Sequence, residues 1–147
     1  MLSFNELEEE IVSVCKGQRE IIAAYVFGSR AMGKGKKASD VGIALLLDDR
    51  EASNFPYLEF KVTLERVLNK NVDLIILNQA GEILRHQVRK YGKIIYESNP
   101  KWRKQWEVLS RKLYQDFLYL HHIYMKKLYD YYGVENGLFS AHFASLR

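Results

Sequence analysis

Residues 25–47 constrain the fold more than any other stretch, because they read as two buried strands joined by a tight turn and a basic loop. The first apolar strand ends at Gly28-Ser29, and a single helical turn is expected over 30–33. A second apolar strand begins at Asp40 and continues to Leu47. Glycine permits close backbone approach, and a serine at the start of a helical turn is well placed to bind phosphate. The stretch therefore favours a phosphate-handling fold.

The rest of the chain switches between helical periodicity and short apolar runs. The expected helices span residues 4–16, 56–68, 80–91 and about 101–132, and the expected strands span 21–27, 40–47, 72–77 and 93–96. Because these elements mix without strict alternation, we predict one α+β domain, a small mixed sheet flanked by helices. The domain is expected over 1–133, including the long C-terminal helix, and 134–147 form a tail. The apolar density of 72–77 predicts a central strand, buried on both faces.

Composition argues against a membrane protein and against a disulfide-stabilised one. The longest unbroken apolar run, Ile43–Leu47, is far too short to span a bilayer. Cys15 is the single cysteine, so a cytoplasmic location is expected, and the acidic first residues lack the layout of a signal peptide. The net charge of +4 favours acidic partners such as nucleotides, but it is lower than is usual for dedicated nucleic-acid binders.

Three motifs together resemble the polymerase-beta-type nucleotidyltransferases, and their minimal nucleotidyltransferase branch in particular. They are Tyr-Val-Phe-Gly-Ser-Arg-Ala-Met-Gly from Tyr25, Ala-Ser-Asp ending at Asp40, and Asn-Val-Asp-Leu-Ile containing Asp73. The resemblance covers most of residues 5–132 and implies the polymerase-beta-like nucleotidyltransferase fold. It also implies that three carboxylates hold two Mg²⁺ ions, which bridge the triphosphate of ATP and activate an attacking hydroxyl.

This chain departs from the family pattern at one of the three carboxylates. Asp40 matches the first and Asp73 the third, and both are implied catalytic and metal-binding residues. Gly28, Ser29 and Arg30 match the nucleotide-binding turn. Gly42 replaces the second carboxylate. Asp48 and Asp49 lie roughly 26 Å from Asp40 along the strand, too far to replace it. The sequence therefore predicts weak or absent chemistry, with binding of one Mg²⁺–nucleotide retained.

The long C-terminal helix carries two apolar stripes at helical spacing. The first is expected to pack on the domain and contains Trp102, Trp106, Leu109, Leu113, Phe117, Leu120, Tyr124, Leu128 and Tyr131. The second occupies only the distal half and contains Tyr114, Leu118, His121, Met125, Tyr129 and Tyr132. Two explanations fit the second stripe: a larger contact with 134–147, or a surface for a partner or for self-association, centred on Tyr114, Leu118, Met125 and Tyr129.

Three functions follow as hypotheses, the first two from the resemblance and the third from the basic loop. Minimal nucleotidyltransferases of this size are commonly antitoxins, whose partner is a HEPN-domain ribonuclease toxin encoded nearby. The first hypothesis is an antitoxin with impaired catalysis that neutralises its toxin mainly by binding. The second is an active Mg²⁺-dependent adenylyltransferase that transfers AMP from ATP to a tyrosine of the partner. The third is a nucleotide-sensing or RNA-binding module that uses Lys34, Lys36 and Lys37.

Overall fold

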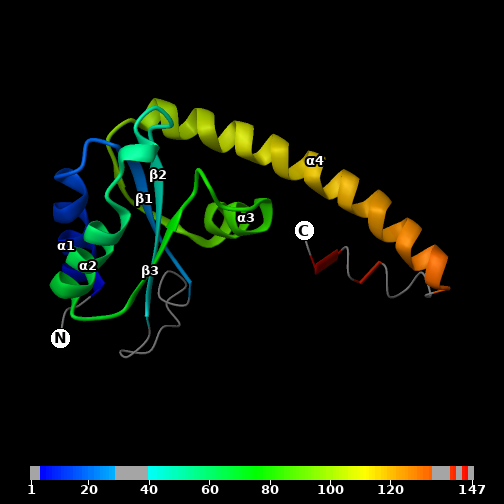
Figure 1. Cartoon of the computed structure of the whole chain (residues 1–147), viewed down its shortest axis with the longest axis horizontal. Coiled ribbons are helices and arrows are strands. Elements are labelled where there is room, and N and C mark those ends of the chain that lie inside the picture. Colours follow the sequence, from blue (N-terminus) through cyan, green and yellow to red (C-terminus); the bar gives the residue numbers. More distant parts are fainter. Residues whose placement is uncertain (1–3, 29–39, 134–139, 142–143, 146–147) are drawn as a thin grey trace.

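The computed structural model describes residues 4–28, 40–133, 140–141 and 144–145. A four-stranded sheet stands between two pairs of helices, and a long helix extends well beyond it (Figure 1). This arrangement confirms the predicted α+β class with a small mixed sheet and a long C-terminal helix. No helix in the described part of the chain is both long and apolar enough to cross a membrane.

The sheet has the order β3-β2-β1-β4. Its strands are β1 (Ile21–Phe27), β2 (Val41–Leu47), β3 (Val72–Ile76) and β4 (Lys93–Glu97). β1 pairs antiparallel with both β2 and β4, while β2 and β3 run parallel. β1 and β2 are therefore central and almost fully buried. The predicted central position of β3 is wrong, because β3 is an edge strand.

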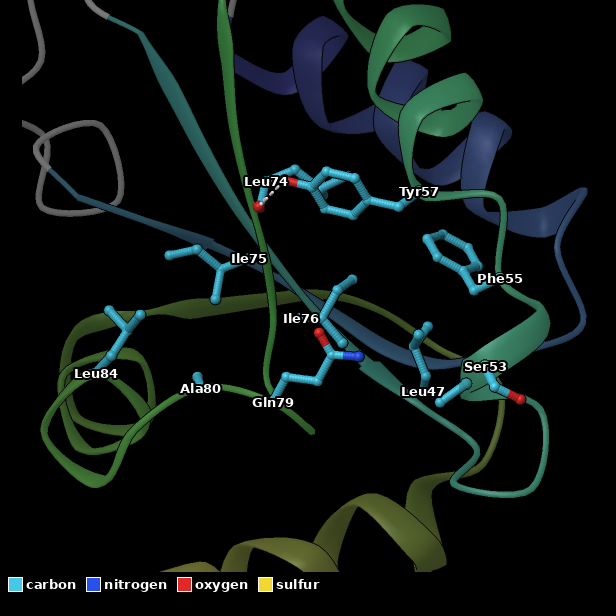
Figure 2. Close-up of a pocket in the computed structure, with 11 residues that line it drawn as sticks. Leu47, Ser53, Phe55, Tyr57, Leu74, Ile75, Ile76, Gln79, Ala80 and Leu84 are labelled. Carbon is cyan, nitrogen blue, oxygen red and sulfur yellow. Dashed lines mark hydrogen bonds between the residues drawn. The ribbon is translucent and has the colours of Figure 1, made fainter.

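Backbone groups on the outer side of β3 are bonded to neighbouring groups rather than left for another strand. The Tyr57 hydroxyl donates a 2.7 Å hydrogen bond to the Leu74 carbonyl, which Figure 2 shows as a dashed line. The Val72 N–H donates to the Glu65 carboxylate at 3.4 Å, and the Gln79 N–H donates to the Ile76 carbonyl at 3.1 Å. Such bonds protect an exposed edge from pairing with another chain.

Helices α1 (Phe4–Lys16) and α2 (Tyr57–Leu68) cover one face of the sheet (Figure 1). Their apolar stripes, which include Leu7, Ile11 and Leu64, meet alternate residues of β1, β2 and β3 in the larger core cluster. Cys15 lies in this core, and burial raises the pKa of its thiol to about 12. The thiol is therefore uncharged and shielded, as expected of a residue that fills the core.

Helices α3 (Glu82–Tyr91) and α4 (Pro100–Tyr132) lie on the opposite face. The α4 residues that are buried are Arg103, Ser110 and Tyr114, with Trp102 and Trp106 half-buried beside them. The prediction that the first apolar stripe packs on the domain is wrong for most of the stripe beyond Trp106, although Phe117 and Leu128 are half-buried. Leu109 is 56% exposed and Leu120 is 65% exposed.

A polar network explains why α4 is turned this way. Arg103 donates hydrogen bonds to Glu97 of β4 and, at 2.8 Å, to Glu107 one turn along the helix. Glu107 also accepts a 2.9 Å bond from the hydroxyl of Tyr25, a fully buried residue of β1. Burial, followed by the negative charge and hydrogen bond of Glu107, raises the pKa of Tyr25. Arg103 and Glu107 thus face the sheet because each finds a partner there.

Replacing Arg103 with alanine is expected to lower the free energy of unfolding by about 2 kcal/mol. The change leaves the carboxylates of Glu97 and Glu107 without their shared cation, and partial exposure of both acids reduces the loss below that of a fully buried pair. Urea denaturation measures the effect. The matched control is Lys104→Ala, at an exposed position of the same helix. Equal losses in the two variants would contradict a role for the network.

Candidate functional site

The ends of three adjacent strands meet at one end of the sheet, and we call this place the strand-end site. Its members are Gly28, Asp40, Gly42 and Asp73. Gly28 follows β1, Asp40 precedes β2, and Gly42 pairs with Phe27 on one side and with Asp73 on the other. Paired residues of neighbouring strands lie about 5 Å apart. The structure thus brings the two aspartates predicted from the sequence to neighbouring strands, where both are exposed.

The turn after β1 begins at Gly28, whose φ of 86° lies in the left-handed region that favours glycine. The structure therefore explains why this turn needs a glycine. The other predicted residues of the turn, Ser29 and Arg30, lie outside the described residues. So do the expected helical turn over 30–33 and the basic loop with its lysines at 34, 36 and 37.

Gly42 lies beneath the side chain of Phe27. A Cβ atom placed on Gly42 would be 2.9 Å from the Phe27 carbonyl oxygen and 3.0 Å from two carbons of the Phe27 ring. The first contact is shorter than real Cβ atoms make, and it is to backbone. A side chain at the position of the second carboxylate would therefore collide with Phe27, and β2 itself contains no acidic residue. The sequence showed the missing carboxylate but not the ring above it.

Asp40 lines a polar pocket of about 420 Å³. The other lining residues come from the end of α2 and the turn that follows it: Glu65, Asn69, Lys70 and Asn71. Asn69 ends α2 in the left-handed conformation, with φ 53°. Glu65 is an acid near Asp40 that the sequence analysis missed, because 25 residues separate the two and no motif links them. Its carboxylate accepts the Val72 N–H, so it also has a structural role.

The carboxylates present do not fit a two-metal centre. Within residues 4–28 and 40–133 and the short described parts of the tail, no three His, Cys, Asp or Glu side chains are grouped to hold a metal ion. Asp48 and Asp49 follow the far end of β2, where Asp49 accepts a 2.6 Å hydrogen bond from Asn78. This position agrees with the distance argument that excluded them. Asp40 and Asp73 remain the carboxylates that the family pattern supplies.

The predicted partner surface on α4 needs one correction. Tyr114 is only 5% exposed, and its ring stacks on His86 of α3 at 4.0 Å between centroids. It therefore packs inside the chain and offers little area to a partner. Leu118, Met125 and Tyr129 are half-buried. The exposed Val108 and Tyr119 lie elsewhere around the helix, but a set of large apolar residues that are open to solvent lies together about 100° from Tyr114.

We call this exposed set the outer face of α4. Its members share one side of the helix and belong to the stripe that was expected to be buried: Leu109, Leu113, Leu120, Tyr124 and Tyr131. Tyr124 is 62% exposed and Tyr131 is 82% exposed. Clusters of exposed apolar and tyrosine side chains are typical of binding surfaces.

A further pocket of about 470 Å³ lies along the edge of β3. Figure 2 shows its aliphatic lining, which includes Leu47, Leu74, Ile76 and Leu84, and the ring of Tyr57 with its hydroxyl bonded to Leu74. No charged side chain lines it, and it contains none of the predicted site residues. The pocket therefore has no groups suited to acid–base or metal chemistry.

Comparison with known proteins bears on the fold and on the family. No curated protein matches this chain. A chain of a toxin–antitoxin complex solved with AMP-PNP is 23% identical, with a TM-score of 0.69 over 82% of this chain and 97% of that one. A chain of the toxin–antitoxin complex MntA–HepT is 21% identical, with a TM-score of 0.63 over 83% of this chain and 96% of that one.

A third solved structure is the complex of tri-AMPylated Shewanella oneidensis HEPN toxin with MNT antitoxin. One of its chains is 21% identical, with a TM-score of 0.63 over 83% of this chain and 95% of that one. At these identities the likeness shows a shared fold. The family model described as polymerase beta, nucleotidyltransferase matches residues 9–101, which is more than half of the sequence. The chain therefore belongs to the polymerase beta nucleotidyltransferase family.

Proposed function

We propose that this protein is a nucleotidyltransferase-fold antitoxin that neutralises a HEPN ribonuclease toxin mainly by binding it. The observation that carries the proposal is Gly42, whose Cβ position is closed by Phe27. A site with two carboxylates on neighbouring strands lacks the bridging negative charge that holds two divalent cations close together. Binding needs no such charge, and it fits the exposed apolar side chains on the outer face of α4.

The proposal places the partner contact on the distal half of α4. Leu120, Tyr124 and Tyr131 supply large, exposed area, and tyrosine is enriched at protein interfaces because its ring packs while its hydroxyl stays hydrated. The half-buried Leu118, Met125 and Tyr129 lie beside them and extend the contact. The similar solved chains come from toxin–antitoxin complexes, two of them named with HepT or a HEPN toxin, which supports a HEPN partner. A cytoplasmic location follows for such a pair.

An active adenylyltransferase is the second candidate. Asp40 and Asp73 are retained at neighbouring strand ends, where they could hold one Mg²⁺ beside a nucleotide bound by Gly28, Ser29 and Arg30. One similar solved complex contains AMP-PNP, and another contains a tri-AMPylated toxin. Under this candidate, AMP passes from ATP to a tyrosine hydroxyl of the toxin, and pyrophosphate leaves.

Variants of the two aspartates separate the candidates. We expect Asp40→Ala and Asp73→Ala to bind the HEPN protein without ATP, each within about twofold of the unchanged chain, because both side chains are exposed and away from α4. Both variants should also still rescue growth of cells that express the toxin. Titration calorimetry without nucleotide and a growth assay measure the two effects. If either variant binds normally but no longer rescues growth, neutralisation needs chemistry and the adenylyltransferase replaces the binding protein.

A further inference from the structure

A third pocket, of about 460 Å³, lies between α3 and α4 and shares no residue with the strand-end site. Figure 1 shows α3 beneath the first half of α4, on the face of the sheet away from α1 and α2. The lining residues are His86, Arg89 and Lys90 of α3, and Arg111, Tyr114, Gln115 and Leu118 of α4. No acidic side chain is among them.

One side of the pocket is aromatic and fixed. The rings of His86 and Tyr114 stack at 4.0 Å with an interplanar angle of 6°, and Phe117 continues the stack at 6.1 Å from Tyr114. The Arg89 guanidinium carbon lies 5.8 Å from the centroid of the Tyr114 ring. Because Tyr114 is buried, these rings hold a constant shape for a ligand.

The charges of the pocket are unbalanced. Arg89, Lys90 and Arg111 all line it. The Nη2 atom of Arg89 is buried and has no hydrogen-bond partner among the described residues, while its Nε donates a long, 3.4 Å bond to the Arg85 carbonyl. Burial, followed by the charge of Arg111, lowers the pKa of Arg89. Glu107 lies 3.8 Å from Arg111 and is also bonded to Arg103.

From this geometry we propose that the α3–α4 pocket binds the phosphate group of a small organic phosphate, with its apolar or planar part against Leu118 and the His86–Tyr114 stack. A buried guanidinium N–H without an acceptor is unfavourable, and a phosphate oxygen supplies that acceptor. The lining carries three cations and no acid, which suits an anion such as phosphate. A pocket of this volume also has room for more than inorganic phosphate.

AMP binding in the absence of Mg²⁺ tests the proposal. Calorimetric titrations use the full chain with AMP, inorganic phosphate and adenosine as separate ligands. We expect AMP to bind best, inorganic phosphate to bind more weakly, and adenosine to show no binding. Arg111→Gln, at an exposed position, should weaken AMP about tenfold, because a charged hydrogen bond is lost. Arg89→Gln should weaken it similarly, with circular dichroism confirming the fold.

Two control variants make the result specific to this pocket. Lys112→Gln removes the same charge from the next residue of α4, outside the pocket, and should change AMP affinity less than about twofold. Ser29→Ala removes a hydroxyl of the predicted nucleotide-binding turn, and it reports whether AMP binds at the strand-end site instead. The proposal would be overturned if Lys112→Gln weakened AMP binding as much as Arg111→Gln, or if only Ser29→Ala lost binding. It would also be overturned if adenosine bound as tightly as AMP, or if AMP did not bind.

Discussion

Replacing Gly42 with aspartate is expected to raise Mg²⁺-dependent AMP transfer to the proposed HEPN partner on the order of 10²-fold, because a third carboxylate restores the missing negative charge. The new side chain would stand directly beside Asp73 on the neighbouring strand and two residues from Asp40. Hard oxygen ligands of this kind are what Mg²⁺ requires. Incubation with labelled ATP, Mg²⁺ and the partner measures the transfer.

The same substitution is expected to lower the free energy of unfolding by about 1–3 kcal/mol, because the added Cβ displaces the Phe27 ring and strains the backbone pairing. Gly42→Ala is the matched control, since it adds the same Cβ without the carboxylate. It should lose similar stability and gain no transfer. If Gly42→Asp transfers no more AMP than Gly42→Ala, the missing carboxylate is not what limits the chemistry.

Removing the side chains of Leu120 and Tyr124 is expected to weaken HEPN binding about 100-fold, as is typical when two central interface anchors are lost. Both side chains are more than 60% exposed, so the double alanine variant should keep the stability of the unchanged chain. Calorimetry with the purified partner measures the affinity, and urea denaturation confirms the fold.

The comparison variant is Met125→Ala with Tyr129→Ala, on the half-buried side of the same distal half. If the outer face of α4 carries the contact, this pair should weaken binding less than Leu120 and Tyr124 do. The reverse order would move the interface to the second apolar stripe, which contains Met125 and Tyr129. Unchanged binding in both pairs would remove the distal half of α4 from the interface.

Local patterns predicted the elements well because each strand and helix is marked by its own residues. The strand Ile21–Phe27 was predicted with its observed bounds, and the helix expected over 56–68 ends at the left-handed Asn69. The motif spacing likewise placed Asp40 and Asp73 near the starts of two strands, and the structure shows that these strands are neighbours. These features depend on neighbours in sequence or on motif spacing, and both are visible in one chain.

Predictions failed where distant residues decide the outcome. The apolar stripe of α4 was expected inward, but Arg103 and Glu107 face the sheet because Tyr25 and Glu97 provide partners there. β3 looked central because it is apolar, yet side chains such as that of Tyr57 allow it to lie at an edge. The ring of Phe27 over Gly42 depends on strand register, which no local pattern reveals.

The length of α4 gives this molecule two regions that evolution can alter separately. Its 33 residues extend about 50 Å, while a seven-residue strand extends about 23 Å, so much of the helix projects past the sheet (Figure 1). Substitutions in two regions so far apart usually have additive effects on the free energy of unfolding. A lineage can therefore lose a carboxylate at the strand ends while selection on the projecting helix preserves recognition, which allows an enzyme scaffold to persist as a binding protein.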